Sequence, residues 1–255
     1  MAISRRSVFA PLPFDKVDSV YSTVLTDEFT GTLANVDLDG LVTVTSDLVW
    51  QGDEGGGDGA PNVAIVPSVV NHPGIIKLST GATTPADGDI CGLFRPQTML
   101  PGADGIYIAC IARIIDISDT KFAFGFAASA TEAVNSSAAN TVQIVFDPED
   151  AADVGDVIAL LQLNVGGTDL EVAFTNAPIT ENEWFLLELA WDSAGCNGRV
   201  TTDDGTESLA LLGAGTTVLK PGFLVEAVGA AEETVDVDKY TERYLRRTQS
   251  DVVGA

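Results

Sequence analysis

The sequence has few of the side chains that metal sites and nucleophilic enzymes use. Its 255 residues include one histidine, His72, and three cysteines, Cys91, Cys110 and Cys196, with no CxxC pair. A thiol–zinc site needs several such ligands at short spacing, and a disulfide framework needs an even set, so the sequence predicts neither. Cys110 lies in the apolar run IYIACIARII and is predicted to be a small buried hydrophobe.

Basic residues are also scarce. The chain has 13 Lys and Arg against 37 Asp and Glu, a net charge of −24, which disfavours nucleic-acid binding because phosphate affinity comes from basic side chains. The body, residues 17–238, holds 6 basic and 34 acidic residues. The basic residues gather at the ends, which either dock on an acidic partner or pair with the acidic body; they are Arg5, Arg6, Lys16, Lys239, Arg243, Arg246 and Arg247.

Long apolar runs are missing as well. No stretch approaches the roughly 18 residues that a membrane span needs, so no membrane contact is expected. The N-terminal SRRSVF is followed by APLPFDKVDS where a signal peptide would be apolar, so we expect no signal peptide and synthesis in the cytoplasm. No cofactor is predicted.

Short alternating or fully apolar runs, separated by turn residues, fill the chain instead. They predict an all-β sandwich of about two six-stranded antiparallel sheets. The expected strands are 41–51, 62–68, 74–80, 105–116, 121–129, 141–147, 157–164, 170–176, 183–192, 198–204, 207–213, 221–229 and 233–246. The runs at 105–116 and 121–129 are expected to pair around ISDT. With no linker in view, we expect an N-terminal arm at 1–25 and one domain at 26–255.

Three segments together resemble the concanavalin A-like jelly roll, the sandwich of lectins, glucanases and laminin-G domains. NEWFLLELAWDSAGCNGRVTTDDGTESLALL (182–212) resembles its hairpins, with a tight turn at Asp204-Gly205. IYIACIARIIDISDTKFAFGFAAS (106–129) resembles its paired core strands, and VDVDKYTERYLRR (235–247) its last strand. DEFTGTL (27–33) resembles its first strand. The resemblance implies a jelly roll across most of the chain.

A narrower resemblance rests on Trp50 through Gly81, with its NHPGIIKLSTG, which is similar to segments in structural proteins of tailed bacteriophages. It implies a non-enzymatic virion protein, most simply a capsid decoration or cement protein in several copies or as a homo-oligomer. Its partners would be the major capsid protein or other virion subunits. The contact candidates are Arg5, Arg6, Lys16, Lys239, Arg243 and Arg247.

His72 is the first candidate for chemistry. A histidine base needs an orienting carboxylate and a nucleophile or substrate group within reach, and VVNHPGII offers none locally. The alternative is structural: Pro73 favours an extended His72, and Gly74 permits a sharp turn. The sequence favours the structural role.

Acidic residues offer weak metal and catalytic sites. NVDLDG places Asp37 and Asp39 as in the first half of a calcium loop, but Ser46 stands where the bidentate glutamate belongs. Glu188 with Asp192, and Asp236 with Asp238, are spaced to share a strand face, as a retaining glycosidase pair would, about 5 Å apart. Asp192 fits a turn better, and Asp236 and Asp238 fit a solvated, edge-like strand, so no enzyme is predicted.

The alternative function is a carbohydrate-binding, lectin-like module, such as a tail adsorption protein or a relative of glycan hydrolases. Its candidates are Trp50 and the neighbouring acids Asp53, Glu54 and Asp58. Trp50 is the best candidate for an exposed sugar platform, although a core position suits it too. The other large aromatic residues are predicted to be core: Phe122, Phe124, Phe126, Trp184 and Trp191.

Overall fold

A computed structural model defines the fold. It describes residues 22–29, 36–37, 42–45, 48–55, 61–66, 69, 71–72, 74–96, 98–99, 105–128, 140–149, 158–165, 168–213 and 217–245. Within these ranges every secondary-structure element is a strand, in two antiparallel sheets of nine and eight strands. The all-β sandwich is therefore confirmed, with more strands than the six per sheet expected from the sequence.

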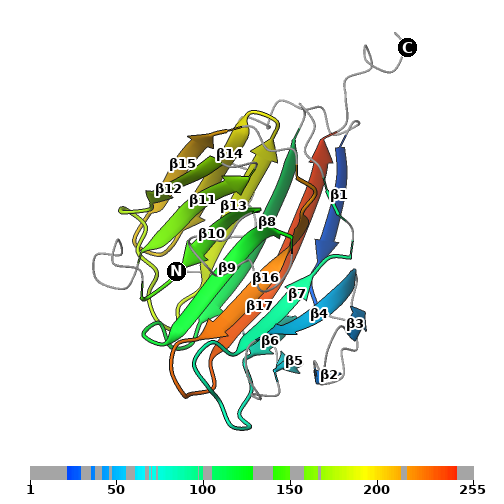
Figure 1. The fold of residues 1–255 in the computed structure, drawn as a ribbon, viewed down its shortest axis with the longest axis vertical. Helices are drawn as coiled ribbons and strands as arrows, with labels where there is room; N and C mark the ends of the chain where they lie inside the picture. Colours follow the sequence, from blue (N-terminus) through cyan, green and yellow to red (C-terminus); the bar gives the residue numbers. More distant parts are fainter. Residues whose placement is uncertain are drawn as a thin grey trace.

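The first sheet, sheet A, follows the order β15-β14-β13-β8-β17-β6-β5-β2, and β1 also pairs with β17 (Figure 1). Its strands are β1 (Ser22–Asp27), β2 (Val36–Asp37), β5 (Asn62–Val66), β6 (Ile75–Ser79), β8 (Ile106–Ile114), β13 (Phe185–Asp192), β14 (Gly195–Thr201), β15 (Thr206–Leu212) and β17 (Thr234–Leu245).

The second sheet, sheet B, follows the order β12-β11-β10-β9-β16-β7-β4-β3. Its strands are β3 (Val42–Thr45), β4 (Val49–Gly55), β7 (Ile90–Phe94), β9 (Thr120–Ala127), β10 (Thr141–Phe146), β11 (Ala159–Val165), β12 (Thr168–Ala173) and β16 (Lys220–Ala227).

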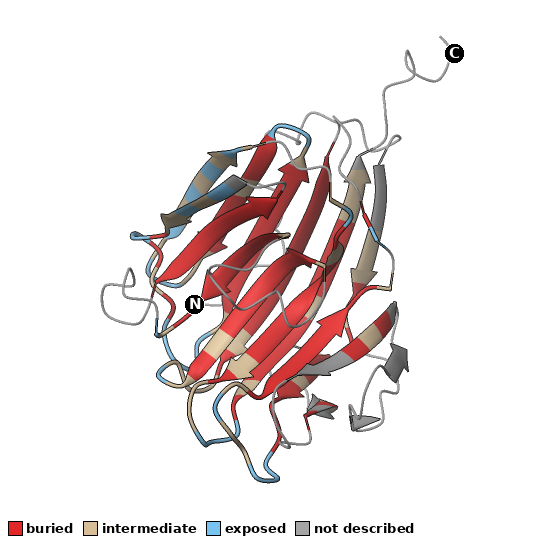
Figure 2. Ribbon diagram, in the orientation of Figure 1, coloured by how far each residue is buried: buried red, intermediate tan, exposed pale blue. Residues whose placement is uncertain are grey.

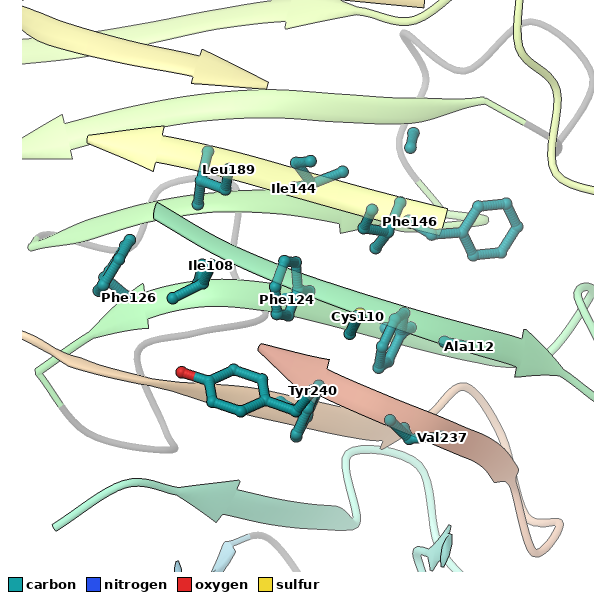
Figure 3. Close-up of a cluster of buried hydrophobic side chains, with 14 of the residues drawn as sticks. Ile108, Cys110, Ala112, Phe124, Phe126, Ile144, Phe146, Leu189, Val237 and Tyr240 are labelled. Atoms are coloured by element: carbon teal, nitrogen blue, oxygen red, sulfur yellow. The ribbon is translucent and has the colours of Figure 1, made fainter. Parts of the chain in front are cut away.

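The core lies between the sheets and is built by strict alternation. On β9 the side chains of Phe122, Phe124 and Phe126 all point inward and are buried, as predicted. Phe124 stacks on Phe223 of β16 with ring centroids 5.7 Å apart, and Phe126 meets Trp191 at 5.2 Å. Figure 3 shows buried side chains from the two sheets packed together in the core. Each such burial contributes about 1.5–3 kcal/mol, so the aromatic rows fix the sheet-to-sheet register.

The central strands are buried on their outer faces too (Figure 2). Tyr107, Ala109, Ile111, Leu186 and Ala190 form a buried cluster on the outer face of sheet A, and Ile90, Phe94, Ala123, Ala127, Val145 and Leu224 form one on sheet B. This double burial explains why these strands are continuous apolar runs. All three cysteines lie in the core between the sheets, as predicted for Cys110, and burial raises the pKa of the Cys91 and Cys196 thiols to about 12.

Several local predictions need correction. The runs around ISDT do not pair: β8 belongs to sheet A and β9 to sheet B, and the chain crosses between the sheets at 115–119. The predicted strand 41–51 is a hairpin of β3 and β4. The first strand is β1, which precedes most of 27–33 and places residues 22–25 of the predicted arm in sheet A. The rest of that arm lies outside the described residues.

Gly74 is required where β1 and β6 meet end to end beside β17. A Cβ at Gly74 would lie 1.9 Å from the carbonyl oxygen of Glu28, which is backbone and cannot rotate away. We therefore expect Gly74→Ala to lower the free energy of unfolding by about 1–3 kcal/mol, because overpacking a tight site forces the backbone to move.

Chemical denaturation would measure this change, with Thr83→Ala, at an exposed position in the loop after β6, as the control. The control should stay within about 0.5 kcal/mol of the parent protein. Equal stability of the two variants would show that the close approach of Gly74 to Glu28 is absent in solution.

Candidate functional site

The candidate site lies on the outer face of sheet A, where β13, β8 and β17 run side by side. Phe185 and Val237 both pair with Ala112, which brings Trp184, Arg113 and Asp236 to one level of the sheet. These side chains point away from the core because Val235 and Val237, one residue away on either side of Asp236, point into it.

A β-bulge in β17 adds a second carboxylate to this level. The register with β8 shifts between Val237 and Lys239, so Asp238 is an extra residue with no partner opposite it on β8. The bulge lets Asp238 and Lys239 both lie on the outer face, while Tyr240 returns to the core.

His72 reaches this level from a tight turn ahead of β6. The turn is closed by two backbone hydrogen bonds, from the Val69 amide to the His72 carbonyl at 3.1 Å and from the His72 amide to the Val69 carbonyl at 2.9 Å. His72 Nδ1 lies 3.1 Å from Asp238 Oδ2, and the imidazole stacks on the Trp184 indole with centroids 4.0 Å apart. The sequence around His72 offers no carboxylate, and the structure supplies one from a distant strand.

Arg113 completes what we call the Trp184 cluster: His72, Arg113, Trp184, Asp236 and Asp238. Its guanidinium forms an ion pair with Asp236 and lies over the indole, 4.9 Å from the ring centroid. The carboxylates lie deepest, with Asp236 4% and Asp238 2% exposed. His72, Arg113 and Trp184 are half-buried above them. The cluster is a group of one indole, two carboxylates, a guanidinium and an imidazole, all buried or half-buried.

The expectation of a solvated face for Asp236 and Asp238 is wrong. It assumed that β17 lies at an edge, whereas β17 pairs with β8 on one side and with β6 and β1 on the other. The other proposed pair, Glu188 and Asp192, is divided between two structural tasks. Buried Glu188 accepts a hydrogen bond from the Tyr107 hydroxyl at 2.7 Å and pairs with Arg199. Asp192 accepts hydrogen bonds from the backbone amides of Ala194 and Gly195, which confirms its role in a turn.

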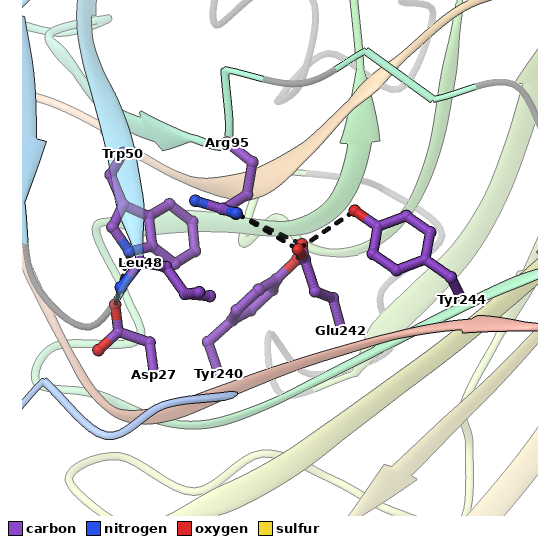
Figure 4. A network of polar contacts seen from close by, with 7 residues as sticks. All are labelled: Asp27, Leu48, Trp50, Arg95, Tyr240, Glu242 and Tyr244. Carbon is purple, nitrogen blue, oxygen red and sulfur yellow. Dashed lines mark hydrogen bonds and ion pairs between the residues drawn. The ribbon is translucent and has the colours of Figure 1, made fainter. Parts of the chain in front are cut away.

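Trp50 is buried at 0% exposure and cannot be a surface platform for a sugar. Its Nε1 donates to Asp27 Oδ2 at 2.9 Å, and its ring lies 4.8 Å from that of Tyr240 (Figure 4). Trp184, predicted to be core, is instead half-buried on the outer face of sheet A, where it packs against the buried cluster that contains Tyr107. Of the two, only Trp184 carries a sequence signal of exposure, since it follows the polar Asn182-Glu183, whereas Trp50 follows the apolar pair Leu48-Val49.

Sequence analysis did not predict the buried polar network beside Trp50. Glu242 of β17 points into the sandwich and accepts hydrogen bonds from Arg95 at 3.4 Å, from the Tyr240 hydroxyl at 2.9 Å and from the Tyr244 hydroxyl at 3.2 Å (Figure 4). Burial first, and then the charge of Glu242, raise the pKa of both tyrosines. The network is internal and joins the sheets.

Most of the remaining predicted contact and ligand residues are not among the residues that the structure describes. Arg5, Arg6, Lys16, Arg247, Asp39 and Asp58 lie outside them, and of Asp37, Asp53 and Glu54 only the backbone, in β2 and β4, is described. Lys239 donates to Glu28 at 3.2 Å, so this candidate contact residue has a partner within the chain. Arg243 is half-buried on the same outer face of β17.

Metal sites and membrane-spanning helices are two further features to consider among the described residues. They contain no group of three or more His, Cys, Asp or Glu side chains placed to hold a metal ion. They also contain no helix long and apolar enough to cross a membrane.

The contact of His72 with Asp238 makes a measurable prediction. We expect His72→Ala to lower the free energy of unfolding by about 1–3 kcal/mol, because a buried carboxylate loses a hydrogen-bond partner. Asp238→Ala and the double variant complete a thermodynamic cycle, in which contacting residues should show a coupling of about 0.5–3 kcal/mol. Val69→Ala, at an exposed position in the same turn, is the control; additive effects of the two substitutions would contradict the contact.

Comparisons with known proteins identify the fold. No protein-family model matches the chain, and no curated protein sequence matches it. Among solved structures, the Lotus tetragonolobus seed lectin is similar at 10% identity and a TM-score of 0.54, over 88% of this chain and 100% of that one.

Two further lectin-type structures agree with this. The Ca²⁺/Man2-bound exoplasmic/lumenal domain of VIP36 is similar at 9% identity and a TM-score of 0.51, over 92% of this chain and 94% of that one. Lectin UEA-II complexed with galactose is similar at 12% identity and a TM-score of 0.50, over 88% and 99%. At such identities the likeness shows the fold alone: the chain is a concanavalin A-like β-sandwich of the kind found in these lectins.

Proposed function

We propose that the chain is a non-enzymatic carbohydrate-binding module and that the Trp184 cluster contacts the ligand. The observation that carries the proposal is the half-buried indole of Trp184, held among polar groups on the outer face of sheet A. The other two tryptophans, Trp50 and Trp191, are fully buried. An apolar ring beside a few fixed polar groups is the usual composition of a small-molecule site.

The contacts within the cluster set how a sugar would bind. The imidazole and the guanidinium both lie against the indole, so the ligand meets the outer rim of the three side chains instead of an open ring face. His72 and Arg113 supply hydrogen-bonding nitrogens for hydroxyl groups, and the buried Asp236 and Asp238 hold those nitrogens in place. Fixing the groups beforehand lowers the entropy cost of binding.

Similar structures lend the proposal secondary support. UEA-II was solved with galactose and VIP36 with Ca²⁺ and Man2. A shared fold does not fix a function, so the proposal rests on the Trp184 cluster. The proposal assigns no metal to this chain. It assigns no catalysis either, because Asp236, Asp238 and Glu188 each lie against a basic or imidazole group of the fold.

The role on a tailed-phage particle, in contact with the major capsid protein or other virion subunits, stays a prediction. Among the described residues nothing favours it over sugar binding, since Lys239 contacts Glu28 of its own chain. A glycan-binding module on a virion would serve adsorption, which unites the two expectations.

Glycan-array screening followed by calorimetry tests the proposal. We expect the parent protein to bind one class of glycan and Trp184→Ala to weaken that binding by roughly tenfold or more, a loss of about 1.4 kcal/mol or more. Val218→Ala, which truncates an exposed apolar side chain away from the cluster, should bind as the parent does.

Thermal unfolding would verify that Trp184→Ala is folded at the assay temperature. Absence of binding to every glycan on the array would refute the function. Undiminished binding by folded Trp184→Ala would refute the site while leaving the function.

A further inference from the structure

Strand β15 forms an open edge of sheet A. On one side it pairs with β14 in an unbroken seven-residue register, from Thr201↔Thr206 to Gly195↔Leu212. Among the strands that the structure describes, none pairs with its other side. Figure 1 shows β15 at the margin of the sandwich, near β12. Its free amide and carbonyl groups form a template for a further strand.

The side chains of β15 alternate between exposed and half-buried along its whole length (Figure 2). Thr206, Ser208, Ala210 and Leu212 are exposed on one face, whereas Leu209 and Leu211 pack against the core. Leu212 is 80% exposed, compared with 46% for Val69 and 48% for Val218, the other exposed large apolar residues described. The edge therefore shows apolar surface to solvent at one end.

The edge lacks the features that keep open strands apart. Natural edges are usually guarded by lysine, proline, bulges or charged side chains. The segment TESLALL has no basic residue, no proline and one acid, Glu207, whose carboxylate accepts hydrogen bonds from the Asn176 amide at 2.6 Å and from its Nδ2 at 2.9 Å. By contrast β12, the corresponding edge of sheet B, carries Asp169 and Glu171 with exposed side chains. In a chain of net charge −24, this edge with a single acid is weakly charged.

We propose that β15 pairs with β15 of a second copy of this chain, in antiparallel register about a two-fold axis at Leu209. This register sets Ser208 opposite Ala210, Thr206 opposite Leu212 and Glu207 opposite Leu211, so no like charges face one another. The seven-residue pair spans about 23 Å and makes sheet A continuous across the two copies. A two-fold contact uses the same surface on both partners, which a self-complementary edge supplies.

The weak charge of this edge allows a second copy to approach it. Two bodies of charge −24 repel each other, and exposed charges are screened beyond about 8 Å at physiological salt, so copies can meet only where local charge is low. Strand β15 is such a place. The inference is independent of sugar binding, although a dimer would hold two Trp184 clusters on one particle.

Sedimentation velocity over a range of protein concentrations tests the pairing. We expect the parent protein to reach twice the 26.6 kDa monomer mass within the micromolar range. Ser208→Lys and Ala210→Lys place a charge at the centre of the edge and should raise the dimer dissociation constant at least tenfold. Thr180→Lys adds the same charge at an exposed position outside β15 and should leave it unchanged.

Hydrogen exchange at 206–212 provides a direct readout, since the amides of this segment that do not bond to β14 should gain protection as the dimer forms. A parent protein that stays monomeric at the highest concentration would overturn the proposal. So would a dimer that both lysine variants retain, which would point to another interface. Protection in the monomer of the amides that face away from β14 would overturn it as well, because the edge would then be covered by the chain itself.

Discussion

Alternation along β17 is the constraint on which both the core and the outer cluster depend. In a strand, successive side chains point to opposite faces, so twelve residues in the middle of sheet A must serve two surfaces at once. The extra residue at Asp238 changes the phase once. Val235 and Val237 enter the core before it, and Tyr240 enters after it. Without the bulge Tyr240 would point outward, and the ring contacts that join β17 to Trp50 and Phe223 would be lost.

The interior beside β17 carries charge, which is costly to bury. Glu242 and Arg95 are both buried, and their ion pair contributes little net stability, because the desolvation cost of two ions can exceed their attraction. The surroundings reduce that cost: two tyrosine hydroxyls donate to Glu242, and the Arg95 guanidinium lies 5.6 Å from the Trp50 ring centroid. Asp27 binds the other side of Trp50. These polar contacts join sheet A to sheet B at positions that apolar packing alone would leave free to slide.

Local patterns in the sequence predicted local structure well. Turn residues and apolar runs located most of the strands, the inward row of Phe122, Phe124 and Phe126, and the turn at Asp192. The tight turn at Asp204-Gly205 is present too, where the Thr202 amide donates to the Gly205 carbonyl. Each of these follows from residues a few positions apart, where chain geometry leaves few alternatives.

Pairing between distant strands was not predictable in the same way. β8 and β9 are adjacent in sequence and both fully apolar, so nothing local reveals that they enter different sheets. The centrality of β17 depends on β1, β6 and β8, and its position decides the burial of Asp236 and Asp238. His72 meets Asp238 across 166 positions of sequence. The candidate site is made almost entirely of such contacts, which explains why sequence analysis weighed His72, Asp236 and Asp238 separately, assigned Trp184 to the core and missed Arg113.

The burial of the three thiols has a consequence for the surroundings that the fold tolerates. Oxidants and disulfide exchange act on the thiolate, and a raised pKa keeps Cys91, Cys110 and Cys196 protonated at neutral pH. Each side chain is also closed off from solvent by the strands around it. The three thiols of the folded protein are therefore shielded from disulfide exchange and oxidation in a reducing or an oxidising medium alike.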